Sequence, residues 1–282
     1  MPARDRLHPA DLDLIDVDVD DDGLSGRFVL GPGLVRHDGT LYGGTGLAAS
    51  VMAFQAASGR DVLWTTTQFV SSPVLGTELR WQVEVLAEGK RSSQLLLRAV
   101  HDGGVAFTAL GSAGIGVEEG LTGQWRRMPP VAPPADARPW EPMRGATAHP
   151  QSWSVHIDLR EAPFVGDEVA STALWARRHD GRPFTSAAIA FAADFVPLGV
   201  ARAAGKLGAG SSLDNSLRFR PGDTTEWILL ELYGDFASGG YGHGEVLVWG
   251  QDGVLVASGS QSAAMKYLFD EGEPNRLPGR RD

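Results

Sequence analysis

Hydrophobic and polar positions divide most of the chain into short runs that predict β-strands. In the first half, the segments 63–70, 78–86, 93–101 and 105–115 are rich in Val, Leu, Thr and Trp and are separated by turn residues, a pattern typical of strands. The stretch from Gly44 to Ser58, GTGLAASVMAFQAAS, differs because small and apolar residues run through it without interruption. We expect it to form a buried helix ahead of these strands.

The second half has the same order of elements. The segment Phe184 to Val196, FTSAAIAFAADFV, predicts a helix, and four apolar runs after it predict strands at 213–219, 226–233, 244–249 and 254–265. Each half also has a β-like segment before its helix, at 14–19 and at 154–159. The pattern therefore predicts, in each half, one long helix against an antiparallel sheet, which is an α+β arrangement.

Turn residues recur at a nearly constant distance. Pro73 and Pro221 each follow the first strand after the helix, and they are 148 residues apart. Asp102-Gly103 and Asp252-Gly253, 150 residues apart, each stand between the last two strands, where Asp-Gly favours a tight hairpin turn. A single offset of this length indicates two copies of one domain.

The two copies are separated by a proline-rich segment, MPPVAPPADARPWEPM, which runs from Met128 to Met143. Proline cannot donate a backbone hydrogen bond to a sheet and disrupts helix interiors, so this segment predicts an extended connector. We expect an N-terminal domain over 1–120, a linker over 121–150, a C-terminal domain over 151–270 and a tail over 271–282.

Composition excludes several classes of function. The net charge is −10, and before the tail no Lys/Arg cluster is longer than two residues, which argues against a nucleic-acid partner. The chain has no cysteine, so thiolate nucleophiles and Cys-based metal sites are excluded. It also has no signal-peptide pattern and no apolar run long enough to span a membrane. We expect a cytoplasmic protein without a metal or cofactor.

Two partial motifs do not change this picture. Asp18, Asp20 and Asp22-Gly23 match the start of a calcium loop, but Val29 stands where the bidentate Glu is required. Gly44-x-Gly46 resembles a dinucleotide-binding turn, yet no buried strand precedes it. Tight packing of the helix explains these glycines better.

Asp194 is the most informative single residue. It lies in AAIAFAADFVPLG, among apolar residues on a helix that we expect to be buried, and Pro197 should end or kink that helix just after it. Burial and the negative end of a helix both raise the pKa of a carboxyl group. A carboxylate whose pKa approaches neutrality suits a general base; the other interpretation is an Asp on the solvent edge of the helix.

Three segments of the second half resemble the C-terminal domain of the acyl-CoA thioesterase II family. They are AADFVPLG, SSLDNSLRFRP and QDGVLVASGSQSAAMKY. In the first half, LYGGTGLAASV and PVLGTELRWQVEVLAEGKRSSQLLLRAV resemble the N-terminal domain. The resemblance implies a double hotdog fold, in which two tandem domains each wrap an antiparallel sheet around a long helix. It implies the hydrolysis of an acyl-CoA by a water that Asp194 activates and that Ser212 and Gln261 help to hold.

The sequence departs from the family pattern at two places. Ser212 stands where the family usually has Thr, and the segment Gly44 to Ser58 has no acidic residue. We therefore expect one active site per chain, in the C-terminal half, with the N-terminal helix supplying packing and part of the acyl tunnel wall. Trp64, Phe69 and Phe191 are candidates for lining that tunnel or for ordinary core packing.

The phosphates of CoA require cations. Lys90 and Arg91 in a turn of the first half, and Arg218 and Arg220 before Pro221, are the candidates. The alternative for each is a solvated charged turn.

Two other functions remain open at this level. A non-catalytic protein that binds acyl-CoA or an acyl carrier would keep the fold without turnover. A hotdog hydratase ranks last, because such enzymes carry an Asp/His pair on the helix and no His lies within 184–196. The resemblance also suggests a role in fatty acid metabolism and a homo-oligomer formed through sheet edges, but the length and type of the acyl group are not determined.

Overall fold

The computed structural model describes residues 2–117, 119–140, 152–165, 172–222 and 225–270. The helices are α1 (Pro9–Leu14), α2 (Gly43–Ser58), α3 (Ser186–Ala192) and α4 (Val196–Ala203), with short 3-10 turns at Ala3–Arg6, Pro32–Leu34 and Trp153–Val155. The strands of the first half are β1 (Asp18–Val19), β2 (Ser25–Val29), β3 (Asp61–Phe69), β4 (Glu78–Glu88), β5 (Ser92–His101) and β6 (Gly104–Gly114). Those that follow are β7 (Arg138–Pro139), β8 (Ile157–Glu161), β9 (Thr172–Arg178), β10 (Lys206–Phe219), β11 (Trp227–Ser238), β12 (Tyr241–Gly250) and β13 (Leu255–Asp270).

All of these strands belong to a single antiparallel sheet. Their order is β1-β2-β4-β5-β6-β3-β10-β13-β12-β11-β9-β8-β7. The two halves meet where β3 pairs with β10, with Asn215 opposite Thr67 and Arg218 opposite Trp64. The hydrogen bond between the Thr66 and Ser216 hydroxyls, 2.8 Å, crosses the same seam. Each half thus supplies the inner edge of its sheet to the other.

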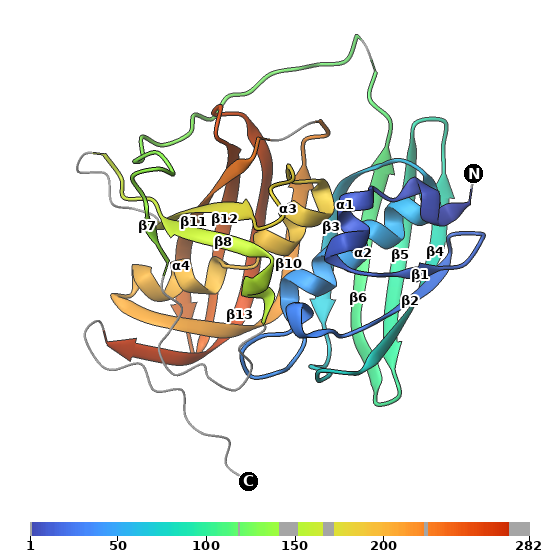
Figure 1. Cartoon of the computed structure of the whole chain (residues 1–282), viewed down its shortest axis with the longest axis horizontal. Coiled ribbons are helices and arrows are strands. Elements are labelled where there is room, and N and C mark those ends of the chain that lie inside the picture. Colours follow the sequence, from blue (N-terminus) through green and yellow to red (C-terminus); the bar gives the residue numbers. More distant parts are fainter. Residues whose placement is uncertain (1, 118, 141–151, 166–171, 223–224, 271–282) are drawn as a thin grey trace.

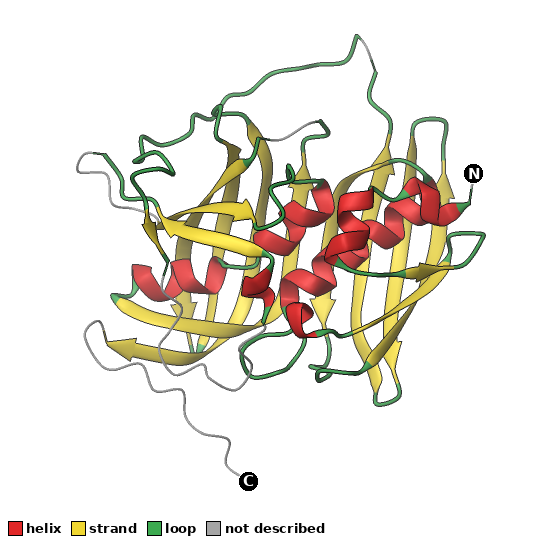
Figure 2. Ribbon diagram, in the orientation of Figure 1, coloured by secondary structure: helices red, strands yellow, loops and turns green. Residues whose placement is uncertain are grey.

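The helices lie together on one side of this sheet, as Figures 1 and 2 show. α2 belongs to the first half and α3 to the second, and they approach closely: the Tyr42 hydroxyl donates to the Phe191 carbonyl at 3.0 Å. The main core fills the space between these helices and the sheet and includes Leu47, Phe54, Phe107 and Phe191. This is the double hotdog arrangement that the sequence predicts.

A second, smaller core covers the opposite face of the sheet in the C-terminal half. Trp175, Trp227 and Trp249 pack there, together with Met128 and Val131 of the proline-rich segment. The Trp175 indole N–H donates to the carbonyl of Ala132 at 2.8 Å. The part of the linker around residues 128–132 is therefore packed against the sheet, whereas Leu121 and Trp125 are exposed.

Most of the predicted elements are confirmed. α2 and the eight strands from β3 to β6 and from β10 to β13 form where the hydrophobic runs place them, and Asp102-Gly103 and Asp252-Gly253 occupy turns. The domain boundaries stay a prediction, and residues 141–150 of the linker and the tail 271–282 lie outside the described residues.

The two strands predicted ahead of the helices are wrong in part. The segment 14–19 is not one strand, because α1 extends to Leu14: the His8 imidazole accepts from the Ala10 N–H and Pro9 starts the helix. The segment 154–159 begins as a 3-10 turn and becomes a strand only at Ile157.

The predicted helix 184–196 is in fact two helices. α3 ends at Ala192, and α4 begins at Val196 with Pro197 in its first turn. Pro197 therefore opens the second helix, where its missing N–H is not needed, instead of ending the first. Asp194 lies in the turn between the two helices.

The stretch Ser186–Ala203 is the one part of the described chain with the length and hydropathy of a membrane-spanning helix, with a mean hydropathy of 1.3. It is split into α3 and α4, and 72% of it is buried inside the protein. Neither helix approaches the ~20 residues that a span requires.

Candidate active site

A cavity of about 250 Å³ opens beside the turn that carries Asp194. Its walls come from the loop before α2, the end of β3, the segment around Trp153, the start of α4 and the first part of β10. The lining residues are Arg36, His37, Asp38, Leu41, Tyr42, Gly43, Phe69, Ser71, Ser72, Trp140, Trp153, Asp194, Phe195, Pro197, Leu198 and 208–212. Both halves of the chain therefore build it.

Three N–H groups donate hydrogen bonds to the Asp194 carboxylate. Its Oδ1 accepts from Gln261 Nε2 at 2.6 Å and from Asn215 Nδ2 at 3.3 Å. Its Oδ2 accepts from the backbone N–H of Gly44 at 3.0 Å. Gln261 Nε2 also donates to Ser212 Oγ at 2.8 Å. The structure thus brings the three residues named from the sequence, Asp194, Ser212 and Gln261, into one connected group.

The orientation of the two amides fits an ionised carboxylate. Asn215 and Gln261 are fully buried, and each turns its N–H toward Asp194 while its own carbonyl oxygen has no partner. An unpaired buried acceptor costs free energy. Donation to a charged oxygen is the stronger kind of hydrogen bond and offsets that cost.

The first turn of α2 is shaped around the carboxylate. Gly44 donates to Asp194 across 150 residues of sequence. A Cβ on Gly43 would lie 2.4 Å from Asp194 Oδ2, and a Cβ on Gly44 would lie 2.2 Å from the Phe191 carbonyl oxygen. Only glycines allow α2 to approach the Asp194 turn this closely, so Gly44 serves packing between the helices.

Burial raises the pKa of Asp194 to about 6, and the hydrogen bonds from Asn215, Gln261 and Gly44 hold it from rising further. The positive charge of Arg36 acts in the same direction as those hydrogen bonds. Burial, followed by the charge of Asp194, raises the pKa of the Tyr42 hydroxyl. Asp194 therefore titrates near neutrality while its neighbour Tyr42 stays protonated.

The sequence did not indicate two features of this site. One is the hydrogen bond from Asn215 to Asp194, and the other is the hydrogen bond from Gly44 of the first half. Asn215 follows Ser212 by three residues on β10, but a bulge near Asp214 shifts the alternation of the strand. No pattern along the chain indicates that Gly44 contacts Asp194. The Gly43-Gly44 pair at a helix start was the available signal.

The four cations proposed for CoA do not line this cavity. Arg91 adjoins Ser92, which lies opposite Gly114, and Gly114 lies opposite Asp61 at the start of β3. The cavity lies at the other end of β3, at Phe69, about 25 Å away along the strand. Lys90 and Arg91 are exposed in their turn.

Arg218 lies opposite Trp64 on β3, between the two ends of that strand, and Arg220 lies two residues further along the chain. The Arg218 guanidinium stands 5.5 Å from the centre of the Trp64 ring, and Arg220 Nη1 donates to Gln124 Oε1 at 3.3 Å. The role of these four residues stays a prediction. Arg36 is a cation at the cavity itself, where it pairs with Asp38.

Of the three residues for which the sequence left tunnel lining or core packing open, Phe69 lines the cavity and also packs against the main core, whereas Phe191 is core. Trp64 lies on the outer face of β3 under Arg218. Within the described parts of the chain, no group of three or more metal-ligating side chains is placed to hold an ion.

Comparison with known proteins bears directly on this geometry. The N-terminal domain model of the acyl-CoA thioesterases matches residues 34–114, and the C-terminal domain model matches residues 121–265. The chain belongs to the acyl-CoA thioesterase family. Among curated proteins, none matches this chain.

Solved structures agree with this acyl-CoA thioesterase fold. A putative thioesterase from Novosphingobium aromaticivorans is 33% identical, with a TM-score of 0.78 over 88% of this chain and 98% of its own. A hot dog fold protein of unknown function from Alicyclobacillus acidocaldarius is 22% identical, with a TM-score of 0.77 over 92% and 99%. The acyl-CoA thioesterase II TesB2 from Mycobacterium marinum is 21% identical, with a TM-score of 0.70 over 91% and 98%. The last two show the fold alone.

Proposed function

We propose that this protein is an acyl-CoA thioesterase in which Asp194 is the general base. The observation that supports this most directly is the network in which one buried carboxylate with a pKa of about 6 shares Gln261 with Ser212 at the wall of a cavity. A base of that pKa is largely ionised at neutral pH and still accepts a proton from water.

The proposed reaction uses a water held between Asp194 and the Ser212 hydroxyl. Asp194 takes one proton from this water, and the remaining hydroxide adds to the carbonyl carbon of the thioester. When the tetrahedral intermediate collapses, the C–S bond breaks and the CoA sulfur takes the proton back from Asp194. The products are a carboxylic acid and CoA.

The N-terminus of α2 is the candidate for stabilising the negative oxygen of the intermediate. The first N–H groups of a helix have no partner within the helix, and they carry its positive end. Gly44 already donates to Asp194, so the Gly43 N–H at the cavity wall is the donor that we assign to the substrate oxygen. Such a donor contributes about 10²- to 10³-fold to turnover.

Gln261 and Asn215 position the base in this mechanism. Their N–H groups fix Oδ1 of Asp194, and Gln261 also fixes the Ser212 hydroxyl. We further propose that Arg36, at the cavity, attracts the phosphates of CoA. Lys90, Arg91, Arg218 and Arg220 do not line the cavity, and their part in binding CoA stays a prediction.

The decisive experiment measures free thiol released from a panel of acyl-CoAs. We expect the native protein to release thiol and Asp194→Asn to lower kcat by about 10²- to 10⁴-fold, the usual range for a general base. Asp11→Asn is the matched control: Asp11 is also buried, binds the Thr185 hydroxyl and has a raised pKa, but it lies outside the cavity.

If no substrate in the panel gives Asp194-dependent thiol release, the thioesterase proposal is wrong. Binding of acyl-CoA without turnover, unaffected by Asp194→Asn, would instead indicate a non-catalytic binding protein. A hydratase has less support, because neither ring nitrogen of His37, which lines the cavity, has a hydrogen-bond partner among the described residues, Asp194 included.

A further inference from the structure

Tyr42 is bonded to both halves of the chain at the cavity wall. Its backbone carbonyl accepts hydrogen bonds from the N–H groups of Thr45, at 3.0 Å, and Gly46, at 3.4 Å, and so begins α2. Its hydroxyl donates to the carbonyl of Phe191 in α3, at 3.0 Å. One residue of the first half is therefore attached to the helix that leads into the Asp194 turn of the second half.

The Phe191 carbonyl is a group that its own helix leaves unpaired. The last four carbonyls of a helix have no N–H partner inside the helix, and α3 ends at Ala192, one residue after Phe191. These carbonyls carry the negative end of the helix dipole. Tyr42 and Phe191 are 4% and 0% exposed, so without the Tyr42 hydroxyl this acceptor would be buried and unpaired next to the Asp194 turn.

Gly44 connects this hydrogen bond to the carboxylate. Its N–H donates to Asp194 Oδ2 at 3.0 Å, and a Cβ on Gly44 would lie 2.2 Å from the Phe191 carbonyl oxygen and 2.4 Å from Tyr42 Cε1. The Tyr42 ring, the Phe191 carbonyl and the Asp194 carboxylate therefore all contact the first turn of α2 at one residue. Two hydrogen bonds hold this turn to the second half, and a helix held at two points cannot pivot about either of them.

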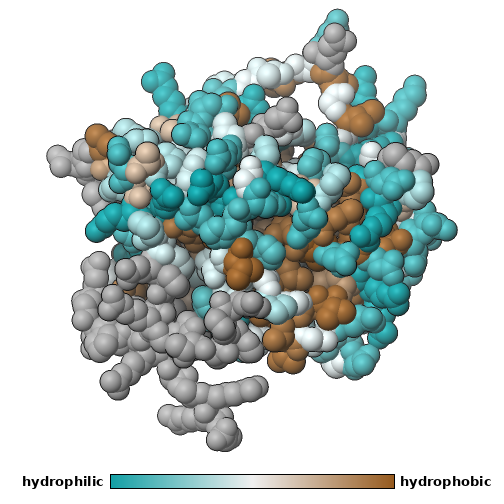
Figure 3. Space-filling model, in the orientation of Figure 1, coloured by the Kyte–Doolittle hydropathy of each residue, from teal (hydrophilic) through white to brown (hydrophobic). Residues whose placement is uncertain are grey.

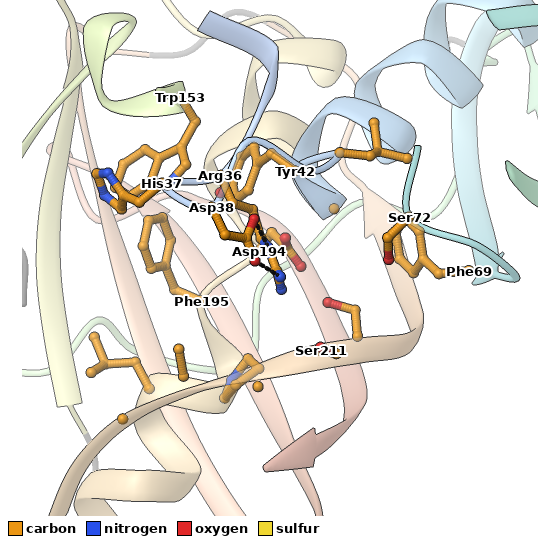
Figure 4. Close-up of a pocket in the computed structure, with 18 of the residues that line it drawn as sticks. Arg36, His37, Asp38, Tyr42, Phe69, Ser72, Trp153, Asp194, Phe195 and Ser211 are labelled. Atoms are coloured by element: carbon orange, nitrogen blue, oxygen red, sulfur yellow. Dashed lines mark hydrogen bonds and ion pairs between the residues drawn. The ribbon is translucent and has the colours of Figure 1, made fainter. Parts of the chain in front are cut away.

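The Tyr42 ring is fixed by its neighbours. It stacks on Trp153, with 5.4 Å between ring centres and 24° between planes, and it meets Phe191 edge-to-face at 5.2 Å and 72°. Trp153 in turn meets Phe195 edge-to-face at 5.0 Å. We call Tyr42, Trp153, Phe191 and Phe195 the ring cluster, and Figure 4 shows Tyr42 of this cluster next to Asp194. Because these ring contacts do not involve the hydroxyl, Tyr42→Phe should keep the packing and remove only the donor.

From these contacts we infer that Tyr42 is a positioning residue of the active site. Its hydroxyl holds the first turn of α2 against the end of α3, so that the Gly44 N–H meets Asp194 and the neighbouring Gly43 N–H faces the cavity. This inference rests on the proposed function, in which Asp194 is the base and the Gly43 N–H binds the substrate oxygen.

A tyrosine at a cavity wall can also donate a proton to a leaving group, but the surroundings of Tyr42 do not suit that role. Its O–H is directed at the Phe191 carbonyl. Burial, followed by the charge of Asp194, raises the pKa of the hydroxyl, and an acid of raised pKa gives up its proton less readily. The hydroxyl therefore acts through the helices that it joins.

The test is the kinetics of Tyr42→Phe in the thiol-release assay. We expect kcat at the plateau of the pH profile to fall about 10- to 10²-fold, because a displacement of about 1 Å at a reacting group can cost ~10²-fold in rate. KM should stay close to the native value, because the ring remains in the cavity wall. A residue that served stability alone would instead lower the urea midpoint of unfolding and leave kcat per folded molecule unchanged.

The acid limb of the pH profile is the second measurement. Without the hydroxyl, the unpaired Phe191 carbonyl places a partial negative charge near Asp194, so the limb should move upward by about half a pH unit. The other charged or titratable groups at the cavity, Arg36, His37 and Asp38, are the same in both proteins. If Tyr42→Phe is only partly folded, KM and the midpoint of the limb still decide, because neither depends on the concentration of active protein.

Tyr241→Phe is the matched control, since Tyr241 is 57% exposed and outside the cavity; it should leave kcat, KM and the pH profile unchanged. If Tyr42→Phe has either the native plateau kcat per folded molecule or the native acid limb, the inference is wrong and the proposed function stands. If the native protein releases no thiol, the proposed function is wrong, and urea unfolding then decides the inference. The pH dependence that Asp194 gives to unfolding should still move upward in Tyr42→Phe, and a dependence identical to that of the native protein would overturn the role of Tyr42.

Discussion

The Asp194 carboxylate is subject to opposing influences on its pKa. Burial favours the neutral acid, while three N–H donors and the charge of Arg36 favour the ionised form. Burial is the larger effect, and the pKa is raised to about 6. At a pKa of about 6, a small change in any hydrogen-bond partner alters the fraction of ionised Asp194 near neutral pH. The predictions at the scale of single residues therefore concern pH.

Activity should rise with pH along a single titration. Because the base must be ionised, kcat/KM should increase about tenfold per pH unit below pH 6 and level off above it. The pH profile of thiol release checks this. A profile that is flat between pH 5 and 8 would contradict the role of Asp194 as base.

Removing the Asn215 hydrogen bond should move that titration. In Asn215→Leu the carboxylate loses a donor that lowers its pKa, so the acid limb should shift upward by about half a unit to one unit. Activity at pH 6 should fall more than activity at pH 8. Ser216→Ala is the control. It removes the hydrogen bond between the Ser216 and Thr66 hydroxyls and should leave the pH profile of activity unchanged.

The free energy of unfolding should also depend on the ionisation of Asp194, but it should fall as the pH rises, whereas activity should increase. The folded pKa of Asp194, about 6, is above the ordinary value of 3.8 for an aspartate, so the stabilising effect is complete below pH 4 and is lost as the pH rises through 6. Between these limits the native protein should lose about 1–3 kcal/mol of unfolding free energy relative to Asp194→Asn. Urea unfolding at pH 4, 5, 6 and 7 measures the difference, and parallel pH dependences of the two proteins would refute it.

At the scale of elements, the start of α2 and the turn between α3 and α4 form one unit. The close approach of Gly43 to Asp194 and of Gly44 to Phe191 leaves no room for a side chain. The break between α3 and α4 turns the Asp194 side chain toward α2. The position of Asp194, the proposed base, therefore depends on the packing of a helix from the other half.

Two alanine substitutions should distinguish an effect on the position of Asp194 from an effect on the free energy of unfolding. Gly43→Ala pushes directly on Asp194 Oδ2, and a displacement of about 1 Å at a reacting group can cost ~10²-fold in rate. Gly44→Ala instead meets backbone at Phe191 and should lower the unfolding free energy by about 1–3 kcal/mol. Gly31→Ala, with no atom within 4 Å of its Cβ, is the control for both kinetics and unfolding.

At the scale of the whole molecule, the two copies have lost their equivalence. The C-terminal copy carries Asp194, Ser212 and Gln261, and the N-terminal copy supplies Tyr42 and Gly43 to the cavity wall and the Gly44 N–H to Asp194. Met128 and Val131 of the linker pack on the outer face of the C-terminal copy, and Trp140 packs against the main core. Figure 3 shows apolar surface gathered over the region of α2, and the exposed Val70 and Val74 flank the cavity residues Ser71 and Ser72.

Neither copy should work alone. A fragment of residues 121–282 lacks the α2 donors and exposes the edge of β10 that normally pairs with β3, and an unpaired edge promotes aggregation. We expect this fragment to release no thiol and to scatter light, and co-expression with residues 1–120 to restore part of the activity. Full activity of the isolated fragment would show that the first half is dispensable.

The order of elements could be predicted because it depends on short stretches of sequence. Alternating or continuous hydrophobic runs determine β3–β6, β10–β13 and α2 with little help from distant residues, and the offset of about 150 residues indicates the duplication. Asp194 could be singled out because a charged residue in an apolar segment is costly wherever that segment is buried.

The contacts that make a site depend on residues far apart in sequence, and no local pattern contains them. Gly44 meets Asp194 across 150 residues, Asn215 turns inward because of a bulge opposite β13, and the ring cluster joins Tyr42 to Trp153. Lys90 and Arg91 have the charge for CoA, yet the pairing of β5 with β6 carries them to the far end of the sheet. Hydrophobic periodicity sets which face of an element is buried, whereas packing between elements sets which side chains meet.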